Sequence, residues 1–153
     1  MIHTVIFDVG GTLVKARSSL ITFSEWLAPN NDKLRKELLD YLIKEFMVIY
    51  RDENRTEFIG IKEIIAIALK KAAEKYDVED ISSQADKRYG EAYLNNANLF
   101  DDTIPTLNKL QEMGLKLIVA SDADPDVLNK ELSTFEIFQY FDEIVISGIV
   151  GAY

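Results

Sequence analysis

The chain has 153 residues, of which 48% are hydrophobic, so it is long enough to bury a core without cross-links. It contains no cysteine, which excludes disulfides, thiolate zinc sites and cysteine nucleophiles, and we expect a reducing, cytoplasmic location. The net charge of −9 disfavours nucleic acid as a partner, and no uninterrupted apolar run is long enough to favour a membrane.

Three short, nearly continuous apolar runs predict strands at residues 4–7, 116–120 and 143–146. Such runs are typical of strands that are covered on both faces in a parallel sheet. A helix that ends at Gly114 precedes the second strand, and a helix that begins at Asp124 and Pro125 follows it. The alternation predicts an α/β fold with a Rossmann-like parallel sheet.

The segment 18–95 follows a different pattern, because its apolar residues recur at helical spacing and it contains almost no glycine or proline. It interrupts the α/β pattern between the first and second strands. We therefore expect an inserted helical subdomain at residues 16–97, within a core formed by residues 1–15 and 98–153.

A lone carboxylate, Asp8, follows the first strand, and Ser121 closes the second. Ligands bind at the carboxyl ends of the strands in open parallel sheets. Gly10 and Gly11 permit a tight turn that presents N–H groups to an anion, and Thr12 adds a hydroxyl donor. This pattern favours Asp8 as a nucleophile for phosphoryl transfer, with a magnesium ion that holds the carboxylate and phosphate together.

The segments FDVGGTLV, LFDDTIPTLNKLQEMG, LIVASDAD and YFDEIVISGIVG follow one another in this order, with a helical insert after the first. Over its whole length the chain resembles the haloacid dehalogenase-like hydrolase superfamily with a helical cap. The resemblance implies a three-layer Rossmann-like core and hydrolysis of a small, phosphorylated molecule. It implies that Asp8 forms an aspartyl intermediate, that Ser121 binds the phosphoryl group together with Gly11 and Thr12, and that Asp8 and the Gly10 carbonyl hold magnesium.

Two departures from the family pattern concern activity. Gly10 stands where the family's phosphatases usually have an aspartate for general acid–base catalysis, which contributes about 10²–10⁴-fold. Relatives that cleave carbon–halogen or carbon–phosphorus bonds also lack this aspartate, so those chemistries stay open. The chain ends at Tyr153, before the lysine and acidic residues that complete the family's site. The resemblance thus predicts an incomplete core, weak magnesium binding and little or no activity.

Other interpretations of the same residues remain open. A fold that has lost catalysis and serves as a binding protein fits the same departures. The DVGGT motif also resembles the phosphate motif of actin-like sugar kinases, although a β-hairpin should follow there and a helical segment follows here. Asp124 is expected to cap a helix and Asp122 to be solvated, so neither is included in the catalytic set.

The three strands also predict self-association. Right-handed crossovers place both connecting helices on one face of the sheet when the strands lie in sequence order. The other face is then bare although its strands are apolar on both sides, and the edge of the first strand is unpaired. We therefore expect a homodimer or higher oligomer, formed through this face, the strand edge or the apolar tail at 149–153.

Overall fold

A computed structural model describes residues 2–53 and 58–151 of the chain. The chain divides into two compact units, which are described separately. Unit 1 contains residues 1–16 and 96–153, and unit 2 contains residues 17–95. No helix in the described parts of the chain is long and apolar enough to cross a membrane.

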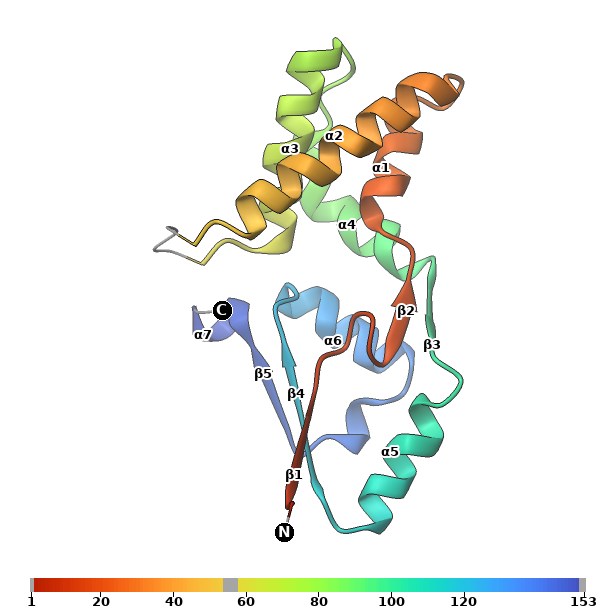
Figure 1. Cartoon of the computed structure of the whole chain (residues 1–153), viewed down its shortest axis with the longest axis vertical. Coiled ribbons are helices and arrows are strands. Elements are labelled where there is room, and N and C mark those ends of the chain that lie inside the picture. The colour runs from red at the N-terminus through yellow and green to blue at the C-terminus, as the bar shows by residue number, and fades with distance from the viewer. Residues whose placement is uncertain (1, 54–57, 152–153) are drawn as a thin grey trace. The chain divides into compact units, whose positions relative to one another are not determined.

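Unit 1 is built on a three-stranded parallel sheet, as the alternation of strands and helices predicts. Its strands are β1 (Thr4–Phe7), β4 (Lys116–Ser121) and β5 (Glu143–Ile146), with β4 in the centre (Figure 1). In the register, Phe7 lies beside Val119, and Ser121 lies beside Ile146. The carboxyl ends of all three strands therefore meet at one edge of the sheet.

Two helices connect the strands of unit 1. Helix α5 (Thr103–Glu112) leads into β4, and Gly114 follows it with φ = 69°, a conformation that glycine adopts without strain. Helix α6 (Pro125–Thr134) has Asp124 at its N-cap position and a proline in its first turn, as predicted, but the Asp124 side chain makes no capping hydrogen bond. A 3-10 helix (Phe138–Tyr140) precedes β5, and the short α7 (Ser147–Val150) follows it.

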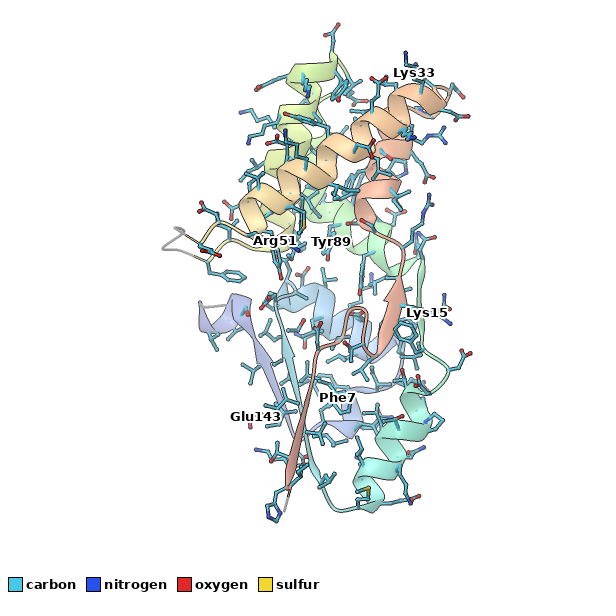
Figure 2. The ribbon with its side chains drawn as sticks, viewed as in Figure 1. Phe7, Lys15, Lys33, Arg51, Tyr89 and Glu143 are labelled. Atoms are coloured by element: carbon cyan, nitrogen blue, oxygen red, sulfur yellow. The ribbon has the colours of Figure 1, made fainter. Side chains whose placement is uncertain are left out.

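Within residues 2–53 and 58–151, one face of the sheet is covered and the other is largely exposed. Leu117 and Val119 of β4 are fully buried in one cluster with Leu107 of α5 and Leu128 of α6. The partly buried Phe7 packs against this cluster, and in Figure 2 it lies on the α5 side of β1. Helices α5 and α6 thus lie on the same face, as right-handed crossovers require.

The opposite face of the sheet carries the alternate residues of each strand. Ile6 is 64% exposed and Val145 is 37% exposed. Ile118 is half-buried, and Lys116 pairs at the rim with Glu143 at 3.0 Å. This face, which we call the bare face, consists of Thr4, Ile6, Lys116, Ile118, Ala120, Glu143 and Val145. The strand pattern predicts apolar side chains in water here, and the exposure of Ile6 and Val145 confirms it.

A second, two-stranded sheet in unit 1 was not predicted. Strand β2 (Val14–Ala16) pairs antiparallel with β3 (Ala97–Leu99), so the two chain segments that lead into and out of unit 2 lie side by side (Figure 1). Each strand has only three residues, which is too short to show the alternation that reveals a strand in a sequence.

The regular secondary structure in the described residues of unit 2 is all helical. Its helices are α1 (Ser19–Leu27), α2 (Asp32–Tyr50), α3 (Ile61–Tyr76), a 3-10 helix (Ser82–Gln84) and α4 (Ala85–Leu94). The side chain of Asn31 caps α2 by accepting a hydrogen bond from the Leu34 N–H at 3.0 Å. Phe23, Leu38, Leu42 and Leu69 are buried at the centre of the unit.

Candidate active site

The candidate nucleophile, Asp8, directly follows β1 at the carboxyl edge of the sheet and is exposed. Its Oδ1 accepts a hydrogen bond from the N–H of Val9 at 2.7 Å. This bond fixes one carboxylate oxygen, and the other is available to a reactant. The next residue, Val9, is 1% exposed and anchors the start of the following loop in the core.

The loop after Asp8 is closed by backbone hydrogen bonds. The N–H groups of Thr12, Leu13 and Val14 all donate to the carbonyl of Val9, at 3.2, 2.9 and 3.0 Å. Gly11 has φ = 79°, and its N–H donates to the carbonyl of Val14 at 2.8 Å. This geometry explains why a glycine stands at position 11, because other residues adopt such a φ only with strain.

These bonds change the expected role of the loop. The Gly11 and Thr12 amides serve the turn itself, so in this conformation neither is presented to an anion as the sequence suggested. The Thr12 side chain is exposed and keeps its hydroxyl as a donor. None of these bonds uses the Gly10 carbonyl, whose oxygen is the predicted metal ligand.

Hydrogen bonds from the start of helix α5 and the residues before it hold this loop. The carbonyl of Leu13 accepts two hydrogen bonds, from the Thr103 hydroxyl at 2.8 Å and from the Phe100 N–H at 3.1 Å. Thr103 is only 3% exposed, and Leu13 and Val14 are also buried. The loop is therefore tied to the core on both sides of its glycines, which holds Asp8 in place.

Ser121 is the last residue of β4, so it lies at the same carboxyl edge of the sheet. Its Oγ accepts a hydrogen bond from the Ala123 N–H at 3.2 Å. Because that oxygen acts as the acceptor, the serine hydrogen is left to donate elsewhere. A hydroxyl in this arrangement is suited to donate to an anionic oxygen.

A third strand end contributes a residue that the sequence analysis missed. Ser147 follows β5, is 8% exposed, and donates a hydrogen bond from its hydroxyl to Oδ1 of Asp122 at 2.5 Å. Asp122 is half-buried, so the expectation that it is merely solvated is wrong. The position of Ser147 directly after a predicted strand was the signal available, since Asp8 and Ser121 were found by the same rule.

The donor chemistry of this edge fits a hard divalent cation such as magnesium, which prefers carboxylate and carbonyl oxygens. Asp8 supplies a carboxylate, and Gly10 supplies a carbonyl. No group of three or more histidine, cysteine, aspartate or glutamate side chains with metal-site geometry occurs within residues 2–53 and 58–151. The residues present could therefore hold part of a magnesium coordination sphere.

The family model described as haloacid dehalogenase-like hydrolase matches residues 2–153 of the chain. The chain belongs to the haloacid dehalogenase-like hydrolases. The match confirms the resemblance read from the sequence and decides against the actin-like alternative. No curated protein sequence matches the chain at a significant level.

Solved structures of similar fold include both dehalogenases and phosphatases. An L-2-haloacid dehalogenase shares 20% identity with a TM-score of 0.68, and the match covers 99% of this chain and 66% of the other. A hydrolase of the same superfamily from Bacillus subtilis, YfnB, bound to magnesium, shares 14% identity with a TM-score of 0.70 and coverages of 95% and 65%. A predicted phosphoglycolate phosphatase from Haemophilus somnus 129pt shares 22% identity with a TM-score of 0.57 and coverages of 96% and 63%.

These likenesses establish the fold of the haloacid dehalogenase-like chain. The chain spans less than two thirds of the length of each of these solved structures. The neighbours represent two reaction types on one architecture, and an architecture alone does not select a reaction.

Proposed function

We propose that the chain performs phosphatase-type hydrolysis through an aspartyl intermediate at Asp8. The observation that supports this proposal is the meeting of Asp8, the Gly10 carbonyl and Ser121 at one edge of the parallel sheet. One Asp8 oxygen is held by the Val9 N–H, and the Ser121 hydrogen is left to donate. A fixed carboxylate and a hydroxyl donor at the same sheet edge suit attack on the phosphorus of an anionic substrate.

In the first step, an oxygen of Asp8 attacks phosphorus and the bond from phosphorus to the leaving oxygen breaks. The leaving oxygen departs as an anion and takes its proton from water. Ser121 donates its hydroxyl hydrogen to a phosphoryl oxygen and holds the group in position. A water molecule then attacks the phosphorus of the aspartyl phosphate, releases inorganic phosphate and restores the Asp8 carboxylate. Magnesium, when bound, supplies positive charge that offsets the repulsion between the carboxylate and the phosphate.

We expect this chemistry to be weak in this chain. Gly10 has no side chain to protonate a leaving group, so substrates with basic leaving groups lose about 10²–10⁴-fold in rate. Unit 1 contains eleven acidic residues, four lysines and no arginine. Lys15, Lys109 and Lys116 pair with Asp101, Glu112 and Glu143. Little positive charge is therefore left in this unit to attract a phosphate.

The test uses p-nitrophenyl phosphate, whose leaving group is stable as an anion and needs little acid catalysis. We expect little or no hydrolysis by the chain with magnesium. We expect measurable hydrolysis once the C-terminal segment of a solved relative is appended, and its loss in Asp8→Asn. Hydrolysis that persists in Asp8→Asn would refute the role of Asp8.

Carbon–halogen cleavage is the second candidate. The same nucleophile, Asp8, can attack carbon, and a halide leaves as a stable anion that needs no general acid. Gly10, which leaves the loop without an acid side chain, favours this candidate. Parallel assays with 2-haloacids distinguish the two reactions. If the chain with the appended C-terminal segment hydrolyses neither substrate class, the result would instead favour a binding protein that has lost catalysis.

We also propose that unit 2 serves as the cap that selects the substrate. It forms a compact helical unit, joined to unit 1 through residues close to the paired strands β2 and β3. Exchange of residues 17–95 for the corresponding unit of a relative should change substrate preference and leave the dependence on Asp8 intact. Unchanged preference after the exchange would argue against this role.

The bare face leads us to propose self-association of the chain. Although the chain has a net charge of −9, this face carries one lysine and one glutamate, so two copies of it can meet without stacking like charges. Burying Ile6 and Val145 against a second copy would remove apolar area from water, at roughly 25 cal/mol per Å². Light scattering on dilution to low micromolar concentration is the test, and a stable monomer at all concentrations would refute it.

A further inference from the structure

The bond between Ser147 and Asp122 joins two neighbouring strand ends. Ser147 follows β5, and Asp122 follows β4. The separation of 2.5 Å between Ser147 Oγ and Asp122 Oδ1 lies in the range of hydrogen bonds from a hydroxyl to a carboxylate, which are stronger than neutral ones. Ser147 is only 8% exposed, so little water competes for this bond.

Asp122 stands within the turn that presents Ser121. The Ser121 oxygen accepts from the Ala123 N–H, so the turn from residue 121 to 123 encloses Asp122. The two hydrogen bonds involve consecutive residues, so both constrain the same short turn. The bond to Ser147 therefore fixes the turn to β5 as well as to β4.

We propose that Ser147 and Asp122 are a positioning pair, which holds the Ser121 hydroxyl toward an anion at the carboxyl edge of the sheet. This inference rests on the proposed function, in which Ser121 binds the phosphoryl group. Ser147 acts through Asp122 and does not touch the substrate itself. Its hydroxyl sets the conformation of the turn, and the turn sets the direction of the Ser121 hydrogen.

Two measurements on the full chain test the pair. The first is the affinity for inorganic phosphate with magnesium, by ³¹P NMR titration. We expect Ser147→Ala to weaken it about fivefold or more, the equivalent of one net hydrogen bond. Ser147→Thr retains the hydroxyl and should restore affinity, and Ser133→Ala, an exposed serine of α6, should leave it unchanged. The second is hydrogen exchange of the Ala123 amide, which should accelerate in Ser147→Ala and stay unchanged in Ser147→Thr and Ser133→Ala.

A cycle with Asp122→Ala separates positioning from a general loss of stability. If the two residues act as one unit, Ser147→Ala should have little further effect on exchange in the Asp122→Ala background. Unchanged Ala123 exchange in Ser147→Ala, or independent effects of the two substitutions, would overturn the inference. Failure of the unsubstituted chain to bind phosphate would count against the proposed function, and the exchange measurement would still decide on the pair.

Discussion

The two units bury their apolar residues in different ways. Unit 2 surrounds a closed helical core in which Leu42 and Ile64 are completely buried. Unit 1 covers one face of its sheet and leaves Ile6 on the other face 64% exposed. A helix needs only one apolar stripe, which its neighbours can cover, whereas a parallel strand is apolar on both sides and needs two layers. Unit 2 is thus complete in itself, and unit 1 calls for a further surface against its bare face.

The units also differ in charge. All five arginines of the chain lie in unit 2, while the candidate nucleophile and Ser121 lie in unit 1, where acidic residues outnumber lysines by eleven to four. An anionic substrate is therefore opposed by the overall charge of the unit that would react with it. The expected weak phosphate affinity follows from this imbalance, and magnesium or cationic groups from outside unit 1 would relieve it.

The largest expected effect tests whether the core of unit 2 is closed. Leu42→Ala removes a fully buried side chain of α2 and should lower the free energy of unfolding by about 2–5 kcal/mol. Ile43→Ala alters the adjacent residue, which is 42% exposed, and should change the free energy by about 0.5 kcal/mol or less. Urea unfolding followed by the fluorescence of Trp26, the only tryptophan, reports on this unit. Equal effects of the two substitutions would contradict a closed core.

A substitution on the bare face should affect self-association and leave the stability of the fold nearly unchanged. Ile6→Lys places a charge on an exposed position, so the fold of unit 1 should tolerate it, while self-association should weaken at least tenfold. The reason is the loss of a side chain whose burial is worth about 1.5–3 kcal/mol. Met113→Lys, at a position 59% exposed beyond the end of α5, is the control and should leave association unchanged. Light scattering measures both, and equal behaviour of the two variants would locate the contact elsewhere.

The sequence predicted most of the fold because its signals are local. The strands at 4–7 and 143–146 were predicted with the bounds that the structure shows, and β4 differs only by including Ser121. The bare face followed from strand order and crossover handedness. Strands β2 and β3 were not predicted, because three residues are too few to show a periodic pattern. Their pairing also joins segments about 80 residues apart in the chain, which a local sequence pattern does not reveal.

The site was predictable in part for a related reason. The positions of Asp8 and Ser121 follow from where their strands end, which is visible in the sequence. The hydrogen bonds of the loop are not visible, so the use of the Gly11 amide within the turn was unexpected. The contact between Asp122 and Ser147 depends on the register of β4 against β5, and that register is set by tertiary packing.

A smaller effect concerns an unsatisfied hydroxyl in unit 2. The Thr22 hydroxyl oxygen of α1 is buried and has no hydrogen-bond partner in the described structure. Thr22→Val keeps the shape of the side chain and removes the unsatisfied oxygen, so we expect a gain of about 1 kcal/mol in unfolding free energy. Thr22→Ser keeps the oxygen and should give no gain. Thermal unfolding compares the two, and destabilisation by valine would show that the hydroxyl has a partner.

The smallest effect belongs to a surface ion pair that joins α2 and α3. Lys71 Nζ lies 2.7 Å from an Oε of Glu45, and their side chains are 46% and 15% exposed. The hydrogen bond from Lys71 lowers the pKa of Glu45, and the same bond raises the pKa of Lys71. Because the lysine is well exposed, solvent screens the pair, and Lys71→Met should cost about 1 kcal/mol or less near neutral pH.

The direction of the pH dependence follows from the two shifts. The lowered pKa of Glu45 means that its stabilisation is complete above its ordinary value of 4.5 and is lost as the pH falls through the lowered value. The raised pKa of Lys71 means that its stabilisation is complete below 10.5 and is lost at higher pH. The stability difference between the original chain and Lys71→Met should thus be constant between these limits and shrink outside them. Urea unfolding at pH 7 and at pH 3 measures it, and a difference that grows on acidification would show that Glu45 does not stabilise the folded state through its charge.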